Sequence, residues 1–314
     1  PAIKAAHYLA LKAVYSETAA TASALASQFP GAVLAYSNDQ FPNLTALLGR
    51  SDITAVIIAM RHVEQPIFIR LALEAGKHVL SEMPILETLS DLHELFAIAA
   101  TLPKPGPRWN VAEPLRFMPD VDYAAGEILK LGPVTGFWTR QVMVMADLLG
   151  PPAQPVLVVA GTNLVQKRLP PVDTVEAVWI AANGVIGSFG YTHGSPVDVP
   201  GAEHVVMCEG GAVELIRRGR DKVVRVYKAN MSPEERVIES GHELAVRLEV
   251  QAWAECLEKG WGDPRLSPWE AIRDLEIARG MLVSGLMHGE RIKVGDGRLL
   301  RGINGERVEI GRVD

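Results

Sequence analysis

The sequence predicts an α/β protein, and three observations within one stretch support that prediction. Residues 55–60 form a short apolar run rich in β-branched residues, which is typical of a strand buried on both faces. From Pro66 the apolar spacing becomes helical, and it stops at Gly76, a favourable C-terminal cap. A second strand follows over residues 77–81. Parallel strands joined by a helix form a right-handed crossover, and open parallel sheets bind ligands at the carboxyl ends of their strands.

The two strand ends of this crossover carry the first candidate site residues. The end of the first strand is Ala59, Met60 and Arg61, and Glu82 and Met83 stand at the end of the second. Arg61 is a permanently charged fork that can pair with a phosphate or a carboxylate. An arginine in a solvated loop is an equal alternative. Two nearby histidines, His62 and His78, are weaker candidates, because a histidine inside a strand is more often packed.

The same stretch resembles the Gfo/Idh/MocA oxidoreductases. Members of that family carry D-x-D-A-V-x-I-A, then a polar loop and a helix, then A-L-x-A-G-K-H-V-x-x-E-K-P; the matching segments here are SDITAVIIA, ALEA and GKHVLSEMP. The resemblance implies a Rossmann-like, parallel-sheet N-terminal domain over residues 1–112 and an α/β C-terminal domain with an open, mostly antiparallel sheet over residues 113–314. It also implies a small-molecule ligand and a homo-oligomer that covers the open sheet face, including the strand 175–179.

The cofactor that this resemblance implies is NAD or NADP. An acid after the strand that ends at Ser16 favours a free ribose 2′-hydroxyl, but Ser16 and Glu17 equally suit a helix start, so the choice between NAD and NADP stays open. The residues expected to contact the cofactor are Ser16, Ala59, Met60, Gln65 and Glu82.

Two expected features of cofactor binding and catalysis are missing from the sequence. The strand over residues 9–16 is not preceded by the usual buried strand and glycine-rich turn that hold the cofactor pyrophosphate. The neighbours of that central strand are expected either to close on each other or to leave backbone groups unpaired. Cofactor binding is therefore expected to be weak or absent. In addition, the family's catalytic lysine corresponds to Met83, which cannot hold a positive charge.

The proton-transfer helix of the family is also reduced. Its pattern G-G-x-x-x-D-x-x-x-H-x-x-D corresponds here to residues 142–150, which contain no histidine and predict only the last turn of that helix over residues 146–150. His193 lies in a different context and is not expected to replace the histidine. No catalytic residue is therefore intact.

Where the first domain ends, the family pattern A-E-N-x-R-F corresponds to residues 112–117, with Pro114 in place of the asparagine. Glu113 and Arg116 are therefore candidates for the substrate cleft. An ordinary ion pair at a helix start is the competing interpretation.

Composition excludes several other classes. A formal charge of −6 with scattered basic residues offers no surface for nucleic acid, and no apolar stretch is long enough for a bilayer. Cys208 and Cys256 are too few for a disulfide framework and are expected to be packed thiols in a cytoplasmic protein. No metal is predicted, because no histidine or cysteine pair has zinc spacing.

Two functional hypotheses follow. The first is an NAD(P)-dependent oxidoreductase of the Gfo/Idh/MocA type, with a sugar-like or polyhydroxylated substrate and impaired catalysis. The second is a catalytically disabled homologue, either a ligand-binding or regulatory protein or the product of a degraded gene.

Overall fold

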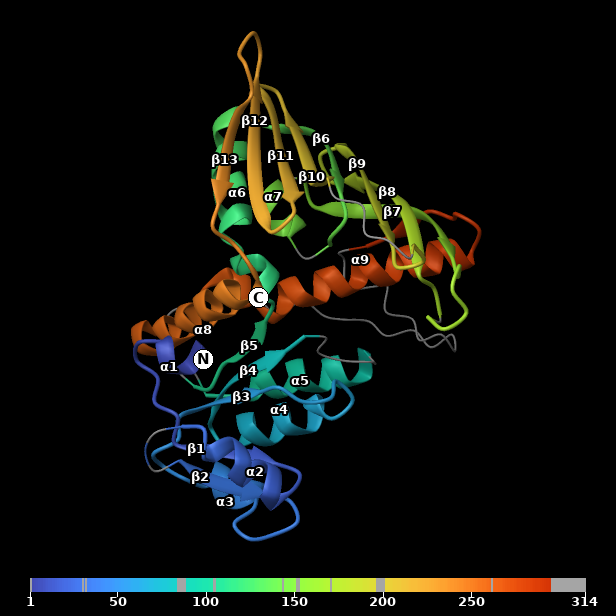
Figure 1. The fold of residues 1–314 in the computed structure, drawn as a ribbon. Helices are drawn as coiled ribbons and strands as arrows, with labels where there is room; N and C mark the ends of the chain where they lie inside the picture. Colours follow the sequence, from blue (N-terminus) through green and yellow to red (C-terminus); the bar gives the residue numbers. More distant parts are fainter. Residues whose placement is uncertain are drawn as a thin grey trace. The chain divides into compact units, whose positions relative to one another are not determined.

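A computed structural model describes residues 2–29, 31, 33–83, 89–103, 106–142, 144–150, 153–169, 171–195, 201–260 and 262–294. The chain forms two compact units, whose helices and strands are labelled in Figure 1. Unit 1 comprises residues 1–113 and 247–268, and unit 2 comprises residues 114–246 and 269–312. The division into domains 1–112 and 113–314 stays a prediction, since contact density within a unit does not establish independent folding.

Unit 1 is built from short parallel strands with helices between them. β1 (Ala13–Ser16) pairs with β2 (Leu34–Ser37), and β3 (Ala55–Ile58), β4 (His78–Glu82) and β5 (Trp109–Ala112) pair in that order. The helices are α1 (Ala2–Ala5), α2 (Ala19–Ala26), α3 (Leu44–Leu48), α4 (Gln65–Glu74), α5 (Leu89–Thr101), most of α8 (His242–Lys259) and the 3₁₀ turn η3 (Pro264–Leu266). The predicted α/β class with a Rossmann-like parallel arrangement is confirmed.

Helix α4 shows why this crossover folds as the sequence predicts. Ile69, Ala72 and Leu73 recur at helical spacing and are buried. At the end of the helix Gly76 has a φ of +72°, which glycine adopts without a steric penalty. The amides of Lys77 and Gly76 donate to the carbonyls of Ala72 and Leu73, the paired bonds of a Schellman cap. The chain is thereby turned directly into β4.

The parallel sheet of unit 1 is split between β1 and β3, which belong to separate sheets. Of the two arrangements expected without a central strand, the structure adopts the one with unpaired edges. Ile57 of β3 is 40% exposed, so the prediction of a strand buried on both faces is wrong at this residue. A strand with a neighbour on one side only lacks the flanking side chains that would cover it. Tyr15 and Phe68, with ring centroids 5.7 Å apart, connect β1 to α4.

Unit 2 contains a nine-stranded sheet in the order β13-β12-β11-β10-β6-β9-β8-β7-β14, in which β6 and β9 alone pair in parallel. Its strands are β6 (Val134–Thr139), β7 (Pro155–Asn163), β8 (Thr174–Ala181), β9 (Ile186–Thr192), β10 (Gly201–Cys208), β11 (Gly211–Arg218), β12 (Asp221–Lys228), β13 (Glu234–Ile238) and β14 (Ile292–Lys293). Its helices are η1 (Pro114–Phe117), α6 (Pro119–Leu131), α7 (Met145–Leu149) and α9 (Pro268–Leu286). The expected open, mostly antiparallel sheet is confirmed.

The two faces of β8 differ in their surroundings. Ala177 and Trp179 are buried on the face that α9 covers, and the Trp179 indole contacts the Met281 sulfur at 3.3 Å. The prediction that Val175, Ala177 and Trp179 share one face agrees with this burial pattern. The open side of the strand is instead formed by Glu176 and Val178.

The turn between β8 and β9 differs from the sequence prediction of a primed turn. The Gly184 amide donates to the Ala181 carbonyl at 3.0 Å, and Gly184 alone in this turn has a positive φ, of +85°. This is a type I turn closed by a glycine bulge, because a primed turn would also require a positive φ at Asn183.

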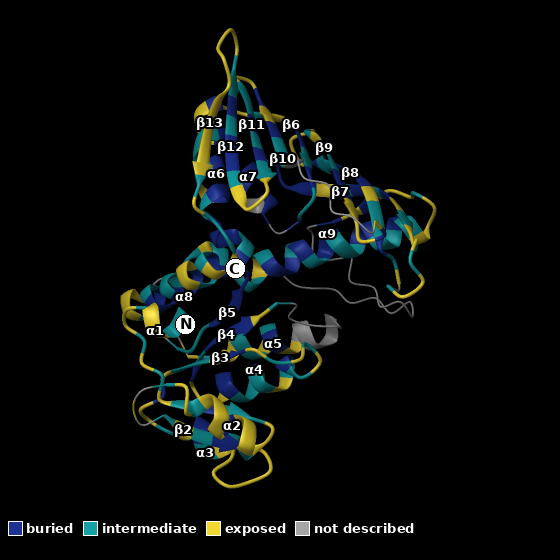
Figure 2. Cartoon of the chain, viewed as in Figure 1, coloured by how far each residue is buried: buried dark blue, intermediate teal, exposed yellow. Residues whose placement is uncertain are grey.

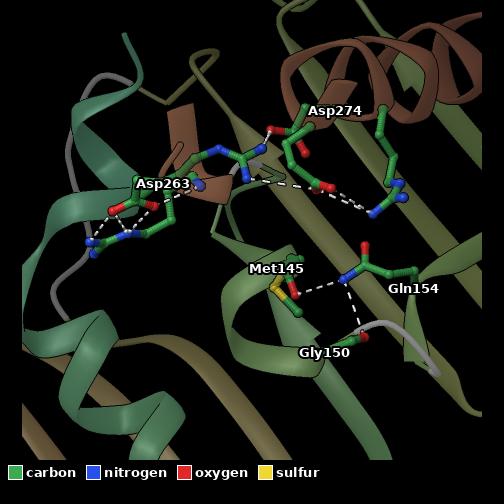
Figure 3. A network of polar contacts seen from close by, with 9 residues as sticks. Met145, Gly150, Gln154, Asp263 and Asp274 are labelled. Atoms are coloured by element: carbon green, nitrogen blue, oxygen red, sulfur yellow. Dashed lines mark hydrogen bonds and ion pairs between the residues drawn. The ribbon is translucent and has the colours of Figure 1, made fainter. Parts of the chain in front are cut away.

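Helix α7 is the short remnant that the sequence predicts, and it runs from Met145 to Leu149. It ends at Gly150, whose φ is +66°. Figure 3 shows the Gln154 amide beside this helix, and it donates to the carbonyls of Met145 and Gly150 at 3.5 and 3.3 Å. Gln154 thus satisfies the end of a helix that carries no histidine.

Candidate functional site

The predicted residues at the end of β3 form a compact loop in unit 1. Gln65 is the first residue of α4, is buried, and donates from Nε2 to the carbonyl of Met60 at 3.4 Å. Ala59 and Met60 therefore lie between the strand end and the helix start, the position expected for a cofactor loop. Their role in cofactor binding stays a prediction.

Arg61 is paired on the protein surface. Its guanidinium contacts Glu17 at 3.5 Å and also binds Glu64, and its side chain is 70% exposed. Exposed pairs of this kind contribute little to stability, so a ligand anion can compete for the arginine. The geometry therefore permits both the ligand-binding and the solvated-loop interpretation of Arg61.

The end of β1 does not provide a phosphate cradle. The Ser16 hydroxyl accepts from Thr21 at 2.7 Å, and the Ala19 amide at the start of α2 donates to the Asp39 carboxylate at 2.9 Å. No glycine occurs in the loops that follow β1, β2 and β3, residues 17–18, 38–43 and 59–64. A pyrophosphate needs glycines for close backbone approach and free amides at a helix start. The residues after these strands do not fit that part of a dinucleotide.

The carboxyl ends of β4 and β5 place two carboxylates in unit 1. Glu82 ends β4 and is exposed, whereas Glu113 follows β5 and is buried. Figure 2 shows the buried character of β5, whose four residues are all inaccessible. Met83 is half-buried directly after Glu82. Pro84, which follows it, lies outside the described residues.

A third carboxylate, Glu249 on α8, joins these two and was missed from sequence. It is 2% exposed and accepts a hydrogen bond from the Glu113 backbone N–H. Burial, followed by the charges of Glu82 and Glu113, raises the pKa of Glu249 to about 8. Glu249 is therefore neutral at pH 7. The sequence signal that could have indicated its burial is its position beside Val250, Trp253 and Ala254, which lie on the buried face of α8.

Arg116, the second predicted cleft residue, lies inside unit 2. It is 1% exposed, its guanidinium binds Asp274 of α9, and Glu270 lies 3.9 Å away (Figure 3). Its carboxylate partners thus come from α9, which differs from a simple pair at a helix start. The Arg116 guanidinium already interacts with two carboxylates of the protein. Its role in substrate binding stays a prediction.

Three of the described histidines, His78, His193 and His204, take part in packing or local hydrogen bonds. His78 accepts from the Arg108 amide at 3.2 Å, and burial lowers its pKa. His193 directly follows β9, is exposed, and lies 2.6 Å from the Tyr191 hydroxyl. His204 is buried 2.8 Å from the Thr139 hydroxyl, and burial, assisted by Lys222, lowers its pKa to about 3. None of these three lies in α7.

A surface hollow of about 720 Å³ in unit 2 is separate from every predicted site residue. It is lined by β7, β8, β9 and the end of α9, including Thr162, Glu176, Ser188 and His288. Across the described ranges, no group of His, Cys, Asp and Glu is arranged to hold a metal ion. No helix in this part of the chain is long and apolar enough to cross a membrane. Cys208 and Cys256 are buried free thiols, as expected.

A sequence match to a known family covers residues 1–105. These residues contain four of the five parallel strands, β1 to β4. These residues match the sequence model described as "Oxidoreductase family, NAD-binding Rossmann fold", that of Gfo/Idh/MocA proteins. Residues 1–105 are therefore similar to the NAD-binding part of the Gfo/Idh/MocA oxidoreductases. The matched residues lie in unit 1, the part of the chain with the Rossmann-like parallel strands.

A curated relative extends the similarity along the chain. Dehydrogenase FPY6 of Fusarium mangiferae is 29% identical over 340 residues, which cover 92% of this chain and 93% of the relative. Because that alignment is longer than the 314-residue chain, FPY6 has segments with no counterpart here.

Solved structures share the whole fold. The aldose-aldose oxidoreductase from Caulobacter crescentus, complexed with glycerol, has a TM-score of 0.76 at 16% identity and covers 94% of both chains. The 3-ketoreductase KijD10 from Actinomadura kijaniata, in complex with NADP and TDP-benzene, has a TM-score of 0.68 at 17% identity, over 90% of this chain and 92% of that one. At these identities the likeness establishes the fold.

Proposed function

We propose that the protein is an NAD(P)-dependent oxidoreductase that acts on a sugar-like or polyhydroxylated small molecule with impaired catalysis. The family match over residues 1–105 carries the reaction class. The substrate class is supported by the names of the structural relatives, an aldose-aldose oxidoreductase and a 3-ketoreductase. We also propose a cytoplasmic location, which two buried free thiols support.

The proposed impairment rests on the chemistry of hydride transfer to or from a carbinol carbon. A proton must be exchanged with the substrate oxygen, and general acid-base groups contribute about 10²- to 10⁴-fold to such steps. Met83 replaces the family lysine, and α7 carries no histidine. This chain therefore lacks the two groups that would usually move the proton and stabilise charge on the oxygen.

Binding of a nicotinamide cofactor is expected to be weak. The loops after β1 to β3 contain no glycine, and the Asp39 carboxylate occupies a donor at the start of α2. Calorimetric titration with NADH and with NADPH measures the affinity directly. We expect dissociation constants well above the micromolar range, and a sub-micromolar value for either cofactor would contradict the proposal.

Restoring the lysine alone is expected not to restore turnover. Met83→Lys supplies a positive charge after β4, but it adds neither a histidine in α7 nor a pyrophosphate cradle. We expect no NAD(P)-linked oxidation above background across a panel of sugars and polyols. Turnover by Met83→Lys alone would show that the missing lysine is the main cause of low activity. Turnover by the wild type would contradict the proposal of impaired catalysis.

A second candidate is a catalytically disabled ligand-binding homologue. Met83 favours it, because the fold is retained while the charged group is lost. Thermal-shift screening of sugars and polyols without cofactor distinguishes the two. Stabilisation that needs no cofactor, with no turnover in any assay, favours the binding protein.

We further propose that the open face of the unit 2 sheet is covered in a homo-oligomer. Ile186 and Met207 flank Gly136 on neighbouring strands and are 58% and 44% exposed, and Val178 is 44% exposed. An apolar patch of this kind is unusual on a monomer. Light scattering at micromolar concentration is expected to give a multiple of the chain mass, and Ile186→Glu to dissociate it. A clean monomer for the wild type would contradict the assembly.

A further inference from the structure

Two buried polar atoms on α8 have no hydrogen-bond partner within the described residues. They are the Glu249 Oε1 atom and the Trp253 Nε1 atom, and both side chains are at most 2% exposed. The residues are four apart on one helix, so their Cβ atoms lie about 6 Å apart on the same helix face. Buried polar groups in native proteins are almost always bonded to protein or to ordered water.

The protonation of Glu249 determines what kind of partner both atoms require. One carboxyl oxygen accepts the Glu113 backbone N–H, and the Glu82 and Glu113 carboxylates are the charged groups that act on Glu249. Both charges favour the neutral acid, as burial does. With one oxygen occupied as an acceptor, the proton belongs on Oε1. Glu249 and Trp253 then present two donors, O–H and N–H, that both need an acceptor.

A single water oxygen matches this requirement. It can accept two hydrogen bonds at once, and buried waters typically bond about three otherwise unsatisfied polar groups. A metal ion does not fit, because both groups are donors. An apolar occupant leaves both donors unsatisfied.

We propose that Glu249 and Trp253 bind one buried water, and that Glu249 with this water holds an exchangeable proton at the carboxyl ends of β4 and β5. In the exchange the Glu249 O–H bond breaks, the proton passes to the water, and the carboxylate remains. The site itself is independent of any turnover. Its use rests on the proposed function, in which reduction of a carbonyl takes up one proton and oxidation releases one.

Nuclear magnetic resonance of the full chain tests the site without an activity assay. Trp253→Phe assigns the indole N–H signal of Trp253. In the wild type we expect cross-relaxation between this N–H and a long-lived water, and a shift of the N–H signal with a midpoint near pH 8. Glu249→Gln keeps the side-chain shape and a donor but cannot titrate. We expect this variant to retain the water signal and to lose the pH-dependent shift.

The matched control is Glu255→Gln, an exposed position on the same helix, which is expected to change neither signal. Backbone amide spectra confirm that each variant is folded. The proposal is overturned if no long-lived water contacts the indole, for example because Trp253 bonds directly to Glu249. It is also overturned if the pH-dependent shift of the N–H signal persists in Glu249→Gln. A protein that shows both signals, but that binds neither NADH nor NADPH at millimolar concentration and turns over no sugar or polyol with either, would refute the proposed function and leave this site intact.

Discussion

Replacing Glu249 with glutamine is expected to stabilise the protein at alkaline pH. The folded-state pKa of Glu249 is about 8, above the value of about 4.3 expected in an unfolded chain, so the folded state binds more protons between these values. Stability due to Glu249 is thus fully present below about pH 4 and is lost as the pH rises toward 8. At pH 8.5 we expect Glu249→Gln to be more stable than wild type by up to about 5 kcal/mol, at ~1.4 kcal/mol per pH unit over the difference between the two pKa values.

Urea unfolding of both proteins between pH 4.5 and 8.5 measures this difference. At pH 4.5 the two should differ by less than about 1 kcal/mol, because folded Glu249 is neutral and the unfolded side chain, close to its pKa of about 4.3, is only partly ionised. Glu255→Gln is the matched control, since Glu255 is partly exposed and paired with Lys259. If wild type and Glu249→Gln lose stability in parallel up to pH 8.5, Glu249 is not the neutral buried acid that its surroundings indicate.

Removing Asp274 is expected to be among the most destabilising single changes in unit 2. Asp274→Ala leaves the Arg116 guanidinium, 1% exposed, with only Glu270 at 3.9 Å. Breaking a buried pair by deleting one partner typically costs about 3–5 kcal/mol, because an uncompensated charge remains buried. Equilibrium unfolding in urea measures the loss.

The double variant Arg116→Met with Asp274→Leu separates charge from packing. Since it removes both charges and keeps apolar volume, we expect a smaller loss than for Asp274→Ala alone. Asp52→Ala, which breaks the surface pair with Arg50, serves as the control and should change stability little. A double variant that is less stable than Asp274→Ala would show that the pair itself, with its geometry, stabilises unit 2.

Local patterns predicted most of the strands and helices, because the determinants are close in sequence. The segments 55–60, 77–81 and 109–112 become β3, β4 and β5, since apolar runs bounded by Gly76 and prolines specify both their type and their ends. The residues 155–163 of β7 were not predicted. Their pairing partners are β8 and β14, and β14 is distant in sequence. The prolines at 151, 152 and 155 favour a loop over a strand in the sequence pattern.

The site was harder to predict because its properties arise from tertiary contacts. The Asn183-Gly184 pair favours a primed turn, yet the register of β8 and β9 makes the loop one residue longer. From sequence alone, a glutamate at position 249 is expected to lie on the solvent-exposed face of its helix. Only the approach of the Glu113 amide and the burial of α8 reveal a neutral acid.

The division of the parallel strands into a pair and a triplet has a consequence for cooperativity. β1 and β2 share four paired positions, and an isolated two-stranded sheet is marginal in water even when a helix packs on it. This pair is attached to the rest of unit 1 by side-chain contacts such as Tyr15 with Phe68 and not by a continuous ladder. We therefore expect this segment to have a low free energy of local opening and to unfold and refold as a sub-global unit while β3, β4 and β5 stay paired.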